Sequence, residues 1–220
     1  MCGRFSLSTD KDDLQSRYGF VEREGALLKP RFNIAPSQLH PVIVIEDDHR
    51  VLKMMKWGLV PHWAKDEKIG YKMINARSEG IETKPSFRAA FKRHRCLVPT
   101  TGFYEWKKVD AKTKQPYFIR LKGGEPFSFA GLWEVWGPDK LETFTIITTK
   151  NNELIEPIHT RMPVILHEKD EAVWLDPELR NVDKLKELLK PYPSDEMEMY
   201  EVSTTVNSPK NESPDCIKPI

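Results

Sequence analysis

The chain has 220 residues, and 34 Lys and Arg against 33 Asp and Glu leave a formal net charge of +1. Global charge therefore does not indicate a nucleic-acid binder, and any such role must depend on local patches. Hydrophobic residues make up 39%, enough to build a core, and the longest apolar runs are far too short to cross a bilayer.

The cysteine content and the N-terminal sequence indicate the cellular compartment of the protein. Three scattered cysteines argue against a disulfide framework or a cysteine-based zinc site, and the N-terminus lacks the apolar segment of a secretory signal. We therefore expect a cytoplasmic protein with reduced thiols and no metal. We also expect a monomer without a cofactor. No linker or internal repeat divides the sequence, so we expect one domain over residues 1–220.

The chain is strand-rich in its patterning, because compact or alternating apolar runs recur between turn signals. We expect strands over residues 4–7, 41–46, 51–57, 96–99, 102–107, 117–121, 127–132, 143–149, 163–166 and 197–203. Helices are expected over 10–18, 86–93, 168–175 and 182–189, and proline-containing loops over 33–36 and 207–219. This order favours an α+β fold around a curved, mostly antiparallel, barrel-like sheet with short flanking helices.

Cys2 is the most informative single residue, because removal of Met1 would leave it with a free α-amine. That amine has a pKa of about 7.7 to 8.0 against roughly 10.4 for lysine, so more of it can attack a carbonyl near neutral pH. The adjacent thiol can then close a five-membered thiazolidine on the imine, which captures aldehydes durably. The same thiol also suits an N-terminal-nucleophile hydrolase, and on the dipeptide alone an ordinary residue is the simpler interpretation.

Two further residues have settings suited to proton transfer. Glu105 lies in a strand-like run between Tyr104 and Trp106, where partial desolvation would raise its pKa. The alternation of side chains along a strand, taken alone, slightly favours the alternative that Glu105 is exposed on the polar face. His159 lies in a proline-bounded loop before a predicted strand, where an imidazole can carry protons, although lone loop histidines are usually surface residues. No His pair has metal-ligand spacing.

Asn75 and Arg77 are two residues apart, which in an extended segment puts both side chains on one face. The guanidinium fork suits phosphate and the amide can orient a hydroxyl or carbonyl, so a sugar-phosphate ligand fits both. The alternative is a buried ion pair with Glu79 or Glu82.

A basic run precedes the strand expected at 96–99, and several aromatic residues elsewhere offer stacking faces. Basic and aromatic groups together suit single-stranded nucleic acid, but charge runs are more often solvated helix faces. The members are Arg88, Lys92, Arg93, His94 and Arg95, with Trp57, Trp63, Tyr71 and Trp106.

A set of ordered motifs extends over nearly the whole chain. They are Met1-Cys2-Gly3-Arg4-Phe5, Asn33-Ile34-Ala35-Pro36-Ser37-Gln38, Trp57-Gly58-Leu59-Val60-Pro61 with Trp63, Asn75-Ala76-Arg77-Ser78-Glu79, Gly102-Phe103-Tyr104-Glu105-Trp106, Ala130-Gly131-Leu132-Trp133-Glu134, Thr145-Ile146-Ile147-Thr148-Thr149, His159-Thr160-Arg161-Met162-Pro163 and Val206-Asn207-Ser208-Pro209. With these motifs the sequence resembles the SRAP (SOS response-associated peptidase) family of abasic-site processing proteins. The resemblance implies a curved antiparallel sheet with flanking helices.

The resemblance also implies a reaction. Mature Cys2 would attack the ring-opened aldehyde of an abasic site in single-stranded DNA and form a thiazolidine DNA–protein crosslink. Asn75 would hold the amine or sugar, Glu105 would assist proton transfers, and His159 would serve the sugar hydroxyl and Schiff-base steps. The family is also linked to β-elimination beside the abasic site (a lyase activity) and to a peptidase role in which the initiator methionine is released autocatalytically.

The same carry-over assigns residues that would contact DNA. Arg77 and Arg161 would grip flanking phosphates, and Arg4 and Asn33 would be nearby contacts. The resemblance places an aromatic wedge and stacking positions at Trp63, Tyr71 and Trp106.

Two other classes of function remain open. A thiol peptidase with Cys2 as nucleophile and His159 as base would leave the two arginines, Arg77 and Arg161, unexplained. A non-catalytic single-stranded-DNA-binding module would make Cys2 and Glu105 dispensable.

Overall fold

The structure is a computed structural model that describes residues 2–22 and 28–220. Its strands are β1 (Phe5–Leu7), β2 (Val21–Glu22), β3 (Arg31–Ile34), β4 (Leu39–Glu46), β5 (His49–Trp57), β6 (Asn75–Arg77), β7 (Arg95–Thr100), β8 (Gly102–Lys108), β9 (Lys114–Leu121), β10 (Phe127–Trp136), β11 (Leu141–Lys150), β12 (Arg161–Pro163), β13 (Ile165–Leu166) and β14 (Met197–Glu201). The helices are α1 (Lys11–Tyr18), α2 (Arg88–Arg93), α3 (Glu168–Leu175) and α4 (Val182–Glu187), with 3-10 turns η1 (Glu67–Lys72), η2 (Ser194–Glu196), η3 (Thr204–Asn207) and η4 (Pro214–Ile217).

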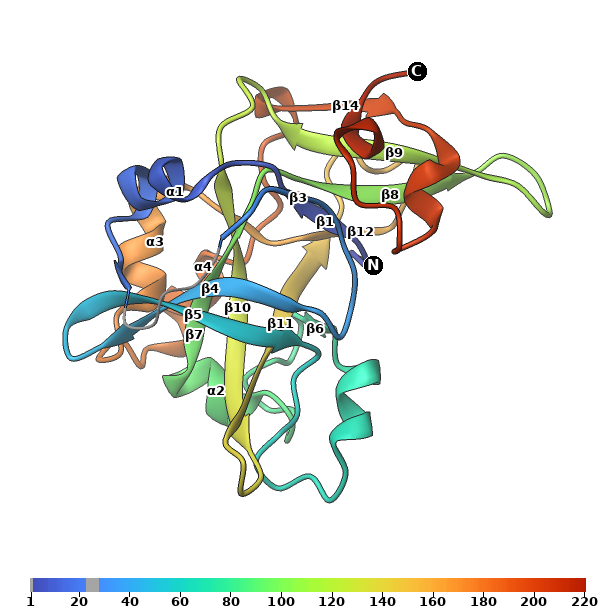
Figure 1. Cartoon of the computed structure of the whole chain (residues 1–220). Coiled ribbons are helices and arrows are strands. Elements are labelled where there is room, and N and C mark those ends of the chain that lie inside the picture. The colour runs from blue at the N-terminus through green and yellow to red at the C-terminus, as the bar shows by residue number, and fades with distance from the viewer. Residues whose placement is uncertain (1, 23–27) are drawn as a thin grey trace.

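The larger sheet closes into a five-stranded barrel. Its strands follow the order β12-β11-β10-β7-β4-β5-β2, and β5 also pairs with β11 in parallel, which closes the five strands from β11 to β5 into a barrel and leaves β12 and β2 outside it. The other barrel pairings are antiparallel (Figure 1). Aromatic rings fill the interior, with the Phe5 ring centroid 4.9 Å from that of Trp57 and 6.0 Å from that of Phe129. The expected α+β fold with a barrel-like, mostly antiparallel sheet is confirmed.

A second sheet carries the N-terminal strand and runs in the order β14-β9-β8-β1-β3. The hairpin of β8 and β9 is its longest part and extends away from the body at the right of Figure 1, above the N-terminus. The C-terminal segment with η3 and η4 covers one face of this sheet, where Tyr104 and Phe118 pack against Val202, Val206 and Cys216. The other face contributes Phe103 to the barrel core.

Short helices flank the barrel, and local signals explain where they begin and end. Asp10 caps α1 by accepting a hydrogen bond from the Asp13 amide at 3.0 Å, and Gly19 ends it with a φ of +59°. The side chain of Arg95 is buried and donates to several backbone carbonyls that close the ends of α2 and α3. Arg95 therefore serves the fold rather than a nucleic-acid surface.

Each of the ten expected strands overlaps an observed one, and each expected helix is present, although α2 and α4 are shorter than predicted. The expected strand at 163–166 is two strands, because the chain crosses at Val164 from β11 to β10. The expected loop at 33–36 begins inside a strand, since β3 pairs with β1. Among the described residues, no helix has both the length and the apolar character needed to span a membrane.

Candidate active site

Cys2 reaches the site through the register of β1 against β8. Phe5 pairs with Phe103, and the Tyr104 amide donates to the Arg4 carbonyl at 2.9 Å. Continuing this antiparallel register brings the chain before Arg4 alongside the end of β8 that carries Glu105. Cys2 is fully buried, with its Sγ 3.8 Å from the Arg4 carbonyl oxygen. Met1 lies outside the described residues.

Glu105 is a buried carboxyl, with only 4% of its surface exposed. Burial raises the pKa of Glu105, and the nearby His159 opposes that rise. Burial, reinforced by the charge on Glu105, raises the pKa of the Cys2 thiol. Burial therefore disfavours the charged form of each group relative to the same group in water. Glu105 therefore has the desolvated setting expected of it. It is not the exposed residue that the alternation of apolar and polar residues along the strand favoured.

His159 approaches from the loop that precedes β12. Its Nδ1 accepts a hydrogen bond from the Arg161 amide at 3.0 Å and lies 3.1 Å from the Arg161 carbonyl oxygen. These contacts fix the ring through Nδ1. Because His159 acts electrostatically on Glu105, which acts on Cys2, the three groups form one cluster drawn from β8, the N-terminus and the loop before β12.

Asn75 begins β6, which pairs in parallel with β11 just beyond the part of β11 that pairs with β5. Both polar atoms of its side-chain amide, Oδ1 and Nδ2, are buried, and neither has a hydrogen-bond partner. An unsatisfied buried polar group costs about 1 to 3 kcal/mol. Such an amide is available to a ligand that brings its own donor and acceptor.

Arg77 and Arg161 flank Thr148 on β11. Arg77 on β6 pairs with Thr148 directly, and Arg161 donates from Nε to the Thr148 hydroxyl at 3.2 Å and from Nη2 to its carbonyl at 2.5 Å. The Arg77 side chain is exposed and makes no hydrogen bond or ion pair in the described part of the chain. The ion pair of Arg77 with Glu79 or Glu82, considered from the sequence, is not formed.

Glu79 is bound by Arg161 instead. The Nη1 and Nη2 atoms of Arg161 donate to Oε1 and Oε2 of Glu79 at 3.0 and 2.9 Å. These hydrogen bonds lower the pKa of Glu79. Glu82 accepts from Lys186 at 2.8 Å.

Arg4 and Asn33 hold the C-terminal segment. Arg4 donates to Asn33 Oδ1 at 2.6 Å and to the Val206 carbonyl at 2.7 Å. Asn33 is fully buried, and its Nδ2 lies within hydrogen-bond distance of the carbonyls of Val206, Ser208 and Asn211. The structure thus places Asn33 at a packing contact, whereas Arg4 remains half-buried beside the site.

The three aromatic residues expected at the lesion lie in different places. Trp63 and Tyr71 are 49% and 62% exposed on the loop between β5 and β6. Trp106 follows Glu105 on β8 and so points to the opposite face, where its Nε1 donates to Asn207 at 2.7 Å. The guanidinium of Arg4 lies 5.9 Å from its ring centroid.

The family follows from comparison with known proteins. The sequence model described as SOS response associated peptidase (SRAP) matches residues 1–209. The chain belongs to the SRAP family. It is 50% identical to the abasic site processing protein YoqW of Bacillus subtilis, with 99% of both chains covered, and 33% identical to the abasic site processing protein HMCES of Gallus gallus, with all of this chain and 78% of that protein covered.

Solved structures support the same grouping. A protein from Bacteroides thetaiotaomicron is 31% identical, covers both chains fully and superposes with a TM-score of 0.90. A phage-related protein from Bordetella bronchiseptica is 29% identical over 91% of this chain and 94% of its own, with a TM-score of 0.73.

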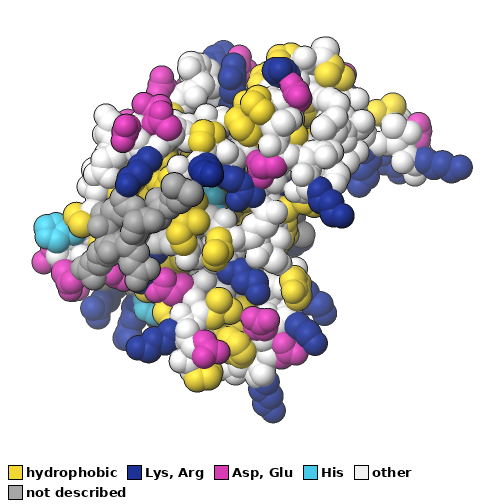
Figure 2. All heavy atoms as spheres, in the orientation of Figure 1, with side chains coloured by type: hydrophobic (Ala, Val, Ile, Leu, Met, Phe, Trp, Pro, Cys, Tyr) yellow, Lys and Arg dark blue, Asp and Glu magenta, His cyan; other side chains and the backbone are white. Residues whose placement is uncertain are grey.

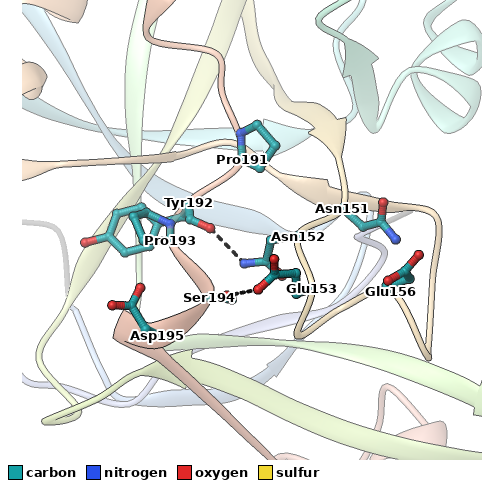
Figure 3. A pocket seen from close by; sticks show the side chains of 9 residues that line it. All are labelled: Asn151, Asn152, Glu153, Glu156, Pro191, Tyr192, Pro193, Ser194 and Asp195. Atoms are coloured by element: carbon teal, nitrogen blue, oxygen red, sulfur yellow. Dashed lines mark hydrogen bonds between the residues drawn. The ribbon is translucent and has the colours of Figure 1, made fainter.

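One hollow of this SRAP chain has the wrong charge for a polyanion. It has a volume of about 490 Å³ and lies where the loop that leads to His159 meets the segment before β14 (Figure 3). Within it, Asn152 donates to the Tyr192 carbonyl at 2.8 Å and Ser194 to Glu153 at 3.2 Å. Glu153, Glu156 and Asp195 also line it, so this side of the His159 loop would repel phosphate.

Sequence reasoning gave no role to Glu79 as a partner of Arg161, to Thr148 or to Asn207. All three lie inside motifs that carry the family resemblance. Their contacts join segments far apart in the chain, such as the 82 positions between Glu79 and Arg161. The motifs therefore marked these three residues as important, but they did not show which residues they contact.

Proposed function

We propose that this protein processes abasic sites in single-stranded DNA by forming a covalent crosslink through mature Cys2. The single observation that carries the proposal is the cluster at Cys2, where a buried thiol lies in the field of the buried carboxyl of Glu105, itself influenced by His159. The names of relatives that are 50% and 33% identical, both abasic site processing proteins, point to the same substrate.

The reaction begins once Met1 has been removed. The α-amine of Cys2 adds to the aldehyde carbon of the ring-opened sugar, and the resulting carbinolamine loses water to give an imine. The thiol sulfur then adds to the imine carbon while its proton passes to nitrogen, closing a thiazolidine. The net change is the loss of one water from protein and DNA together.

In this reaction Glu105 supplies and removes protons. A carboxyl with a raised pKa keeps its proton nearer neutral pH, so it can donate to the sugar oxygen during ring opening and to the departing hydroxyl of the carbinolamine. His159 assists at the sugar hydroxyl. Asn75, with its unpartnered buried amide, holds the amine or the sugar.

The raised pKa of the Cys2 thiol favours aldehyde capture over a thiol peptidase. A cysteine peptidase needs a thiolate, which requires a lowered pKa, whereas here burial and Glu105 favour the neutral thiol. In aldehyde capture the amine attacks first, and the thiol reacts only after the imine has formed. The same imine is the branch point for β-elimination beside the abasic site.

Arg77 and Arg161 grip the phosphates on either side of the lesion, at the two flanks of Thr148. Trp63 and Tyr71, both exposed, stack on or wedge between neighbouring bases. Arg4, half-buried beside the site, contacts the DNA there. Asn33 acts indirectly, by holding Arg4 and the C-terminal segment in place.

The test is the intact mass of the protein after mixing with a single-stranded oligonucleotide that carries one abasic site. We expect a species equal to protein without Met1 plus oligonucleotide minus water, formed without reductant and only with the damaged strand. Cys2→Ala keeps the α-amine but lacks the thiol, so it should give no stable adduct unless borohydride reduces the imine.

Matched controls are Cys96→Ala and Cys216→Ala, which remove the other two buried thiols. Both should form the adduct normally. A stable adduct in Cys2→Ala, or none in the mature unmodified chain, would overturn the proposal.

A further inference from the structure

The β8–β9 hairpin presents a group of unpaired lysines beside the candidate site. Four lysines lie within eight residues at its outer end, and all are exposed: Lys107, Lys108, Lys112 and Lys114. Within the described ranges none of them has an ion-pair partner. Figure 2 shows Lys and Arg side chains at the end of this arm, with the molecular surface hollowed beneath it.

The register of the hairpin places two of these charges directly opposite each other. Lys108 pairs with Lys114 across the strands. Like charges in directly opposed positions destabilise a hairpin. The one carboxylate of the turn, Asp110, accepts hydrogen bonds from the amides of Lys112 and Thr113 at 2.7 and 2.8 Å, so it orders the turn. A bound polyanion would relieve the repulsion that remains.

A pocket on the outer half of the hairpin combines two of these lysines with an aromatic ring. It is lined by Trp106, Lys112, Lys114 and Asn207 and has a volume of about 420 Å³. Asn207 fixes the indole by accepting its N–H at 2.7 Å. An aromatic face flanked by ammonium groups suits a nucleotide unit, whose base can stack while its phosphate is neutralised.

We propose that this pocket, together with Lys108, binds the DNA strand that runs on from the lesion, as a second subsite outside the crosslinking centre. The inference rests on the proposed function, because a strand held at Cys2 supplies the polyanion. Continuity supports it through Arg4, which is half-buried beside the crosslinking centre and has its guanidinium 5.9 Å from the ring centroid of Trp106. The hairpin thus continues the basic and aromatic surface away from the site.

The experiment measures binding of undamaged single strands, which needs no crosslink. A fluorescently labelled 5-nucleotide strand and a 20-nucleotide strand are titrated with the full-length protein and with the variant K112Q/K114Q. We expect the variant to lose most of the affinity advantage of the long strand over the short one. Two lost phosphate contacts should also reduce the salt sensitivity, so between 50 and 200 mM salt the unmodified protein should lose about sevenfold more affinity than the variant.

The matched control is K169Q/K184Q, which removes two exposed lysines on α3 and α4, at the other side of the molecule from the hairpin (Figure 1); neither lysine has an ion-pair partner among the described residues. It has the same net charge as K112Q/K114Q and should bind both strands as the unmodified protein does. Equal length dependence and equal salt dependence in K112Q/K114Q and the control would overturn the proposal.

The two proposals fail separately. If the intact-mass test gives no adduct while the hairpin variant still loses long-strand binding, the subsite remains a nucleic-acid site and only the covalent chemistry is lost. If the adduct forms while the hairpin variant binds long strands normally, only the second subsite is wrong.

Discussion

The guanidinium of Arg161 holds the carboxylate of Glu79 through two hydrogen bonds of 3.0 and 2.9 Å, beside Thr148 of β11, where a phosphate is proposed to bind. With its bonds to Thr148, four of the five N–H groups of Arg161 are engaged. A phosphate can then be gripped bidentately only if it displaces Glu79. Because Glu79 is half-exposed, this competition takes place in water and is weak.

Glu79→Gln should therefore tighten binding of undamaged single strands, by up to about fivefold, which corresponds to the roughly 1 kcal/mol upper range of exposed ion pairs. The salt dependence should become steeper, because one more cation is available to phosphate. Fluorescence anisotropy over a salt series measures both.

The control for Glu79 is Glu82→Gln, which breaks the neighbouring pair with Lys186 and should leave strand binding nearer to that of the unmodified protein. Weaker binding in Glu79→Gln would mean that the carboxylate orients Arg161 rather than competing with DNA for it.

The Glu79 pair also illustrates which features the sequence predicts. Strands and helices were predictable because apolar periodicity and capping residues such as Asp10 act over a few positions. The partner of Arg161 was not, because Glu79 and Arg161 meet only after β6 and β12 have each paired with β11. Motifs marked the residues, but tertiary pairing decided their contacts.

The burial of Glu105 and Asn33 could not be predicted from the sequence either, because it too depends on tertiary pairing. Alternation along β8 leaves open whether Glu105 faces solvent, because its burial depends on the pairing of β1 with β8, which brings the N-terminus beside it. Asn33 lies in a run that is typical of a loop, yet it belongs to β3 because β1 pairs with it and the carbonyls of the C-terminal segment satisfy its amide.

Glu105→Gln should change both the rate and the pH dependence of stability. Adduct formation should slow by roughly 100-fold or more, as for loss of a general acid–base group. Because burial raises the pKa of Glu105, the folded protein keeps a proton that the unfolded chain releases near pH 4.5. Stability of the unmodified protein should then fall as the pH rises from that value through the raised pKa, and Glu105→Gln should lack this decrease.

Urea denaturation at pH 4.5 and at pH 8 tests the sign of this effect. The free energy of unfolding of Glu105→Gln, relative to the unmodified protein, should rise with pH. Glu125→Gln, which replaces an exposed carboxyl, should show no such trend. If the free energy of unfolding of Glu105→Gln, relative to the unmodified protein, fell as the pH rises, that result would contradict a raised pKa of Glu105.

Asn33→Ala should destabilise the protein through the C-terminal segment. The substitution leaves buried carbonyls without their donor and deprives Arg4 of an acceptor, so we expect a loss of about 2 to 4 kcal/mol in urea denaturation. Trypsin should also cleave after Lys210 faster. Asn211→Ala removes an exposed bond to the Thr205 carbonyl in the same segment and should cost no more than about 1 kcal/mol. Equal losses in the two variants would show that Asn33 does not anchor this segment.

The loop that carries Trp63 and Tyr71 depends on a close contact between two glycine backbones. A Cβ on Gly70 would lie 2.6 Å from the Gly58 carbonyl oxygen, and Gly58 itself has a φ of +128°. Because neither backbone can move without opening the loop, Gly70→Ala should cost about 1 to 3 kcal/mol of stability. If the two aromatic residues contact DNA, Gly70→Ala should also weaken the binding of single-stranded DNA.

Gly137→Ala is the control for Gly70→Ala, because it strains the backbone without creating a steric clash. Gly137 has a φ of +71°, but a Cβ at this position would meet no atom within 4 Å beyond its chain neighbours, so the substitution strains only the backbone of an exposed turn. It should lower stability modestly and leave strand binding unchanged. Loss of stability in Gly70→Ala without loss of strand binding would remove Trp63 and Tyr71 from the proposed DNA surface, because their loop would then have been displaced without consequence for the ligand.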